Sequence, residues 1–183
     1  CAAVAAAQAP VTPLGPQFQL NEVEACSLGV PHPAAFADGE LWIWSEGGPV
    51  GDPDSPRLLR SARFGLDGTP LPVPFPVQGD SQDVSLHRID QDPTGNLWLG
   101  WASSSRDSIH VRALGRLDEP RPEASMPVSG VTSLDVAAAP GGHALLVWTD
   151  ARLDASRLLY RLFGPDGEPV HDVTFENVQA GER

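Results

Sequence analysis

Internal repetition constrains the fold of this chain more than any other feature of its sequence. Three segments each place a glycine five or six residues before a tryptophan, and these tryptophans are Trp44, Trp101 and Trp148. Each segment then continues through a polar loop and a second hydrophobic run to another glycine. These later glycines are 50 and 49 residues apart, and they are Gly65, Gly115 and Gly164. A near-constant period of this length indicates a chain built from similar supersecondary units.

Each repeat has the pattern of a series of short β-strands. The run that ends in the tryptophan is apolar, as expected of a strand covered on both faces, and the next run alternates apolar and polar residues. Tight turns are expected at Asp67-Gly68 and Asp166-Gly167, because glycine supplies the positive φ that such turns require. The predicted strands, in the order first to fourth within a repeat, are 83–90 and 131–138; 40–44, 96–101 and 144–148; 57–64, 107–114 and 156–163; and 70–77 and 168–175.

Four antiparallel strands repeated about every 50 residues are typical of a β-propeller blade. The repeats also resemble a propeller repeat found in many bacterial surface proteins, which has a strand ending in Trp, then Asp-x-Arg, then a strand rich in Tyr and Arg, then an Asp-Gly turn. Trp148, Asp150, Arg152, Tyr160 and Asp166-Gly167 carry this resemblance. It covers roughly residues 33–175, although the Asp-x-Arg element occurs only in the third repeat. It implies a repeat architecture and says little about activity.

The predicted fold is therefore all-β, a β-propeller-like array of about three four-stranded blades. We expect residues 1–16 to be a flexible tether and residues 17–183 to be the repeat domain. The repeats within that domain are 33–78, 83–126 and 130–175. Closed propellers typically have four to eight blades, so three blades do not close a ring. We expect another protein chain, or a second copy of this one, to complete a larger propeller.

Charge and composition exclude several classes of protein. The chain has 24 acidic and 12 basic residues, and its formal net charge is -12. Nucleic-acid backbones require a basic face, so no nucleic-acid partner is predicted. No apolar run reaches the length of about 18 residues that a membrane-spanning helix needs. A hydrophobic content of 41% is sufficient for a folded core.

The two cysteines bear on where the protein is located. The chain begins with Cys1, and cleavage of a lipoprotein signal leaves a lipid-bearing cysteine at this position. Lipid on Cys1 would attach the protein to a membrane, and the predicted localisation is secreted or cell envelope, as an outer-membrane or periplasmic lipoprotein. The alternative is that the chain is a fragment produced by a cut. Cys26 is the only other cysteine, and a Cys1–Cys26 bridge is a further alternative, which lipid on Cys1 would exclude.

Two groups of residues are candidates for ligand binding. Arg106 and Arg152 have the guanidinium groups that would pair with an acidic ligand such as a sialic or uronic acid. The structural alternative is that Asp150 and Arg152 form an ion pair that ties one blade to the next. Asp52 and Asp54 are candidate ligands for calcium, and the alternative is an exposed polar loop. No other cofactor is predicted.

Motifs for catalysis do not occur in the sequence. It contains no G-x-S-x-G element, no dinucleotide or P-loop motif, and no histidine pair with metal-ligand spacing. The tryptophans at matched repeat positions are interpreted as blade-core residues. The predicted function is a non-enzymatic binding or scaffolding subunit, an accessory of a larger complex. The alternative is a carbohydrate-binding or carbohydrate-active propeller with its site on the loops 45–56, 102–106 and 149–155.

Overall fold

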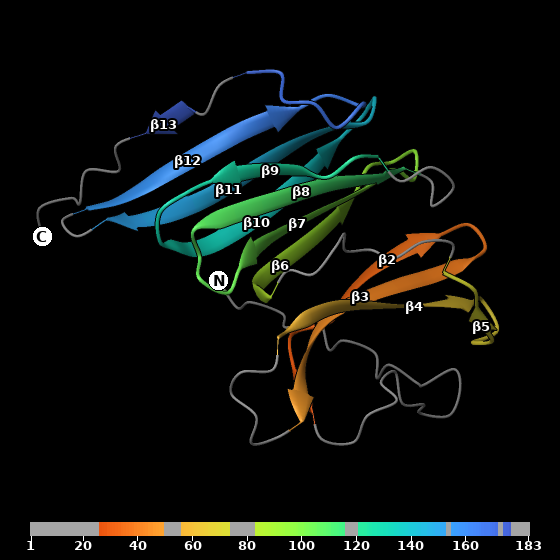
Figure 1. Ribbon diagram of the computed structural model, residues 1–183. Coiled ribbons are helices and arrows are strands. Elements are labelled where there is room, and N and C mark those ends of the chain that lie inside the picture. Colours follow the sequence, from red (N-terminus) through yellow and green to blue (C-terminus); the bar gives the residue numbers. More distant parts are fainter. Residues whose placement is uncertain are drawn as a thin grey trace, which may run out of the picture.

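The computed structural model describes residues 26–49, 56–73, 83–115, 121–152, 155–171 and 174–176, and it is all-β. The strands form three antiparallel sheets (Figure 1). Sheet A contains β1 (Cys26–Leu28), β2 (His32–Phe36), β3 (Gly39–Pro49), β4 (Leu58–Gly65) and β5 (Pro70–Leu71). Sheet B contains β6 (Val84–Gln91), β7 (Leu97–Ser103), β8 (Ser108–Gly115) and β9 (Ala124–Pro127). Sheet C contains β10 (Val131–Ala139), β11 (His143–Arg152), β12 (Ala155–Phe163) and β13 (Thr174–Glu176).

Each sheet follows the order of the chain from one edge to the other. Sheets B and C have the orders β6-β7-β8-β9 and β10-β11-β12-β13. In sheet A the first position is divided, because β1 and β2 both pair with β3, at different places along it. The division falls next to Pro31, which has no amide hydrogen for a ladder bond. No helix long and apolar enough to cross a membrane occurs in the described part of the chain.

The three sheets stack face to face, with sheet B between the other two (Figure 1). Every residue of β7 is buried, because its alternate side chains enter two different cores. Leu97, Leu99 and Trp101 pack in the core shared with sheet A. Trp98 and Ala102 pack in the core shared with sheet C. The expectation that such apolar runs are strands covered on both faces therefore holds for β7, whereas the run 144–148 in β11 has a described sheet on one face.

Backbone hydrogen bonds connect neighbouring sheets where their strands begin. The amide of Val84 in sheet B donates to the carbonyl of Arg57 at 2.8 Å, just before β4 of sheet A. The amide of Val131 in sheet C donates to the carbonyl of Arg106 at 3.2 Å, just before β8 of sheet B. Asp90 adds a side-chain link, because its Oδ2 accepts from the amide of Ala138 in β10 at 2.8 Å.

The predicted second and third strands agree with the structure at all six places, and the first strands agree with β6 and β10. Gly68 and Gly167 adopt φ values of 79° and 88°, as the two Asp-Gly turns require. The fourth strands are shorter than predicted, since β5 ends at Leu71 and β13 begins at Thr174. The sequence patterns did not predict β1, β2 or β9.

Candidate functional site

The face of sheet C that points away from sheet B carries half-buried apolar side chains, and no described sheet packs on it. Along β11, Ala144, Leu146 and Trp148 are buried against sheet B. Because side chains alternate along a strand, the residues between them point to the opposite face. The pairing of β11 with β12 extends this face across two strands. Its members are half-buried, and they are Leu145, Val147, Thr149, Leu158, Tyr160 and Leu162. We call these six residues the outer face of sheet C.

The corresponding faces of the other two sheets are covered. Each of these faces points toward the sheet that follows in the chain. In sheet A it contains Leu41 and Ile43, both fully buried by sheet B. In sheet B it contains Trp98 and Ala102, both buried by sheet C. The outer face of sheet C occupies the same position in the order of stacking, and no described sheet lies on it.

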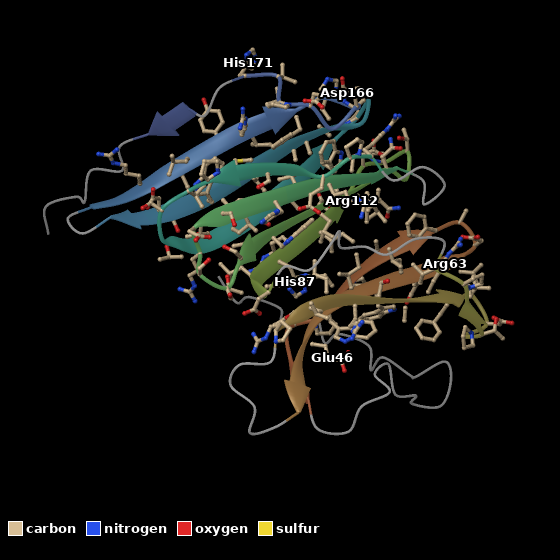
Figure 2. The ribbon with its side chains drawn as sticks, viewed as in Figure 1. Glu46, Arg63, His87, Arg112, Asp166 and His171 are labelled. Carbon is tan, nitrogen blue, oxygen red and sulfur yellow. The ribbon has the colours of Figure 1, made fainter. Side chains whose placement is uncertain are left out.

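A cleft of about 680 Å³ separates the turn end of sheet A from that of sheet B. Phe36 at the end of β2, Asp38 before β3 and Arg63 of β4 line it from sheet A, and Gln91 at the end of β6 and Thr94 in the β6–β7 turn line it from sheet B. Arg63 Nη2 donates to Asp38 Oδ2 at 2.6 Å. Figure 2 shows Arg63 near the turn end of sheet A. A second, smaller cleft of about 320 Å³ lies at the same end of sheets B and C, between Glu123 and Arg161.

Asp92 forms part of the wall of the larger cleft, but the adjacent turn already uses its carboxylate. It accepts hydrogen bonds from the amide and hydroxyl of Thr94, both at 2.8 Å, and from the amide and Nδ2 of Asn96 at 2.9 and 2.8 Å. Burial raises the pKa of Asp92, whereas the hydrogen bonds from Asn96 and Thr94 lower it and prevail, so the pKa is about 2. The carboxylate therefore adds a fixed negative charge beside the cleft.

A pair of histidines marks the place where β2 and β6 meet. The rings of His32 and His87 lie edge to face, with centroids 5.1 Å apart. Burial is the largest cause that lowers the pKa of His87, to about 4, and the charge of His32 lowers it further. Burial also lowers the pKa of His32, followed by the charge of Arg88. Figure 2 shows His87 on the side of sheet B that faces sheet A. Both rings are thus neutral packing groups at neutral pH.

Ser108, His110 and Glu123 form a hydrogen-bonded chain. His110 Nε2 lies 3.2 Å from Ser108 Oγ, and His110 Nδ1 lies 2.7 Å from Glu123 Oε1. A serine–histidine–carboxylate order can activate a hydroxyl for attack. Here, however, the imidazole is 5% exposed and stacks on Trp101, and Ser108 lines neither of the two clefts described above. We interpret this chain as the means by which a buried histidine satisfies both ring nitrogens.

The sequence-predicted binding residues lie at the opposite end of the sheets from the cleft. Arg106 is exposed in the β7–β8 turn with φ of 59°, and Asp150 is 2% exposed near the end of β11. Val131 brings these two together, because it donates to the Arg106 carbonyl and pairs with Asp150. Arg152 is the last residue of β11, and its side chain lies outside what the structure describes. The proposed Asp150–Arg152 ion pair therefore stays a prediction.

The remaining predicted sites fall on residues that the structure does not describe. Cys1, Asp52 and Asp54 all lie outside the described ranges, so lipid attachment and calcium binding stay predictions. Within the described ranges, no three His, Cys, Asp or Glu side chains gather closely enough to hold a metal ion. The cleft lined by Arg63 and Asp38 was not predicted.

Comparison with known proteins identifies no relative. No protein-family model matches the chain, and no curated protein or solved structure is detectably similar to it. The function of this chain is therefore inferred from its own residues.

Proposed function

We propose that this chain is a non-enzymatic binding or scaffolding module, whose outer face of sheet C is covered by a further β-sheet. The single observation that carries the proposal is the half-buried apolar surface formed by Leu145, Val147, Leu158, Tyr160 and Leu162. Contiguous apolar patches on a protein surface mark interaction sites. The partner sheet comes from another protein chain or from a second copy of this one.

The way in which the described sheets pack supports a sheet as the partner. Two sheet-to-sheet interfaces exist among the described residues, and in each a central tryptophan of one sheet points toward the sheet before it. Trp101 of sheet B packs in the core with sheet A, and Trp148 of sheet C packs in the core with sheet B. A third interface of the same kind would place a partner's aromatic side chain against Val147 and Tyr160.

The arrangement is also the one expected of a partial β-propeller. Each sheet is a meander, and β2, β6 and β10 are the first strands that adjoin their neighbours. In a propeller, first strands surround the axis and further blades complete the ring. We propose that the chain supplies three blades of such a ring. Its place in the bacterial envelope or secreted fraction is part of the proposal, and it rests on the resemblance to surface propeller repeats.

Site-specific photo-crosslinking tests the proposed interface. A benzoylphenylalanine at position 160, on the outer face of sheet C, should crosslink to another polypeptide in the native host and leave a product heavier than the chain. The matched control is the same probe at Leu66, which is 80% exposed in the β4–β5 turn of sheet A. Equal crosslinking from both positions, or none from position 160, would count against the proposal. A product of twice the chain's mass would identify a second copy as the partner.

An intact-mass measurement tests the proposed membrane attachment. Protein isolated from the native host should be several hundred daltons heavier than its sequence if Cys1 carries acyl chains. The bare sequence mass would rule out lipid at Cys1, and it would leave the interface proposal untouched.

A further inference from the structure

The cleft between sheets A and B has the composition of a small-molecule site and is independent of the outer face of sheet C. Its volume of about 680 Å³ lies within the usual range for ligand sites, about 300–1,000 Å³. At the equivalent end of sheets B and C the cleft is smaller, about 320 Å³, and a Cβ on Gly142 of sheet C would lie 3.8 Å from Asn96 of sheet B.

The polar groups in this cleft form a donor–acceptor pair. Arg63 has five N–H donors, and Asp38 is its one hydrogen-bond partner in the described part of the chain. The Asp38 side chain is 64% exposed, whereas that of Arg63 is 18% exposed. The carboxylate holds the guanidinium in place and keeps its other lone pairs open to the cleft. Neighbouring hydroxyl groups of a ligand could therefore donate to Asp38 and accept from Arg63.

The rest of the lining fits the same class of ligand. Phe36 is partly buried against the core and also lines the cleft, so it offers an aromatic surface next to the ion pair. Gln91 lines the cleft from the facing sheet, and its Nε2 makes a contact of 3.5 Å with the Gly95 carbonyl. That contact leaves the side-chain carbonyl of Gln91 as an acceptor.

Charge disfavours anionic ligands. Asp38 offsets the charge of Arg63, and the carboxylate of Asp92 on the wall is ionised and already saturated by its own turn. The cleft is therefore net negative in a chain of formal charge -12, and both charges repel an anion. We propose that this cleft binds a neutral saccharide, with Asp38 and Arg63 contacting its hydroxyl groups and Phe36 contacting a sugar ring. Such a site lies at the opposite end of the sheets from the loops that the sequence suggested for carbohydrate.

Calorimetric titration of the full chain tests this site. The probes are the neutral hexasaccharides cellohexaose, maltohexaose, chitohexaose, mannohexaose and xylohexaose, with hexagalacturonate as the anionic comparison. At least one neutral probe should bind, and more tightly than hexagalacturonate does. Asp38→Asn and Arg63→Gln should each weaken that affinity at least tenfold, and Phe36→Leu several-fold. Asp38 is exposed, so its variant keeps the fold even if Arg63→Gln does not.

A second ion pair in sheet A supplies the matched control. Arg60 Nε lies 3.4 Å from Glu46 on the opposite face of sheet A, and Figure 2 labels Glu46 below that sheet. Arg60→Gln and Glu46→Gln should leave the affinity within twofold of that of the unmodified protein. The proposal is overturned if no neutral probe binds at millimolar concentration, if hexagalacturonate binds best, or if Asp38→Asn binds as well as the unmodified chain.

Discussion

At the scale of single residues, His87 predicts how stability depends on pH. Its pKa of about 4 in the folded chain lies below the value of 6.5 for the free side chain, so the unfolded state binds the proton more readily. Stability is therefore complete above pH 6.5 and falls as the pH decreases from 6.5 to 4, by roughly 3 kcal/mol. His87→Gln should remove most of this loss and leave the contribution of His32. Urea unfolding at pH 7.5 and 4.5 measures this loss in the free energy of unfolding.

The exposed His171 provides the control for that experiment. His171→Gln should retain the pH dependence of the unmodified chain. If His87→Gln instead retains the full loss of stability between pH 7.5 and 4.5, then His87 is not the buried neutral group that the structure describes.

A second prediction at this scale concerns Asp92, whose carboxylate accepts the side-chain and amide hydrogen bonds that organise the β6–β7 turn. Asp92→Ala leaves the amides of Thr94 and Asn96 and the Thr94 hydroxyl without their acceptor. It also removes one of the two acceptors of Asn96 Nδ2, and should cost about 2–4 kcal/mol. Asp67 accepts only from the amide and hydroxyl of Thr69, in an exposed turn, so Asp67→Ala should cost clearly less. Chemical denaturation of the two variants gives the comparison, and equal losses would contradict the central role of Asp92.

Sequence reasoning identified some residues and not others, for physical reasons. The tryptophans at matched repeat positions were expected in the core, and all three are buried: Trp44, Trp101 and Trp148. A large apolar side chain on a strand is removed from water most readily by facing the core. The buried positions of His87 and His110 were not predicted. Their burial depends on partners such as His32 and Glu123, which no local pattern reveals. The Asp38–Arg63 pair depends on the register of β3 and β4, which brings together residues 25 apart in the sequence.

At the scale of elements, β11 should show two faces of different energetic weight. Leu146 is fully buried against sheet B, whereas its neighbour Leu145 is half-buried on the outer face of sheet C. Leu146→Ala should cost about 2–5 kcal/mol, and Leu145→Ala in the isolated chain less than half as much. The two variants remove the same atoms from adjacent positions, so equal losses in urea unfolding would contradict the assignment of the faces.

Strands with a strong local sequence pattern were predicted, whereas strands that depend on pairing with distant residues were not. The second strands were predicted because continuous apolar runs ending in Trp need two covered faces, and β7 has both. The strands that sequence reasoning missed have weak local signals. Residues 32–36 contain a proline, and residues 124–127 are Ala-Ser-Met-Pro. Pairing with β3 and β8 makes strands of these segments, through contacts distant in sequence.

At the scale of the whole molecule, the stack of three sheets leaves one end different from the other. On the outer face of sheet A, Trp44 and Phe64 are buried, at 6% and 9% exposed. On the outer face of sheet C, the apolar side chains are only half-buried. An apolar face of this kind, with no described sheet on it, favours association at sheet C. The proposed function therefore depends on association at the outer face of sheet C, and it belongs to an assembly and not to a single chain.

Light scattering on the purified chain tests that claim most directly. The chain alone has a mass of 19.4 kDa. We predict a native mass clearly above this value, from a second copy or from another chain that co-purifies. Val147→Glu places a charge on the outer face of sheet C and should return the mass to that of the single chain. A mass of 19.4 kDa for the unmodified protein, unchanged by Val147→Glu, would contradict the account.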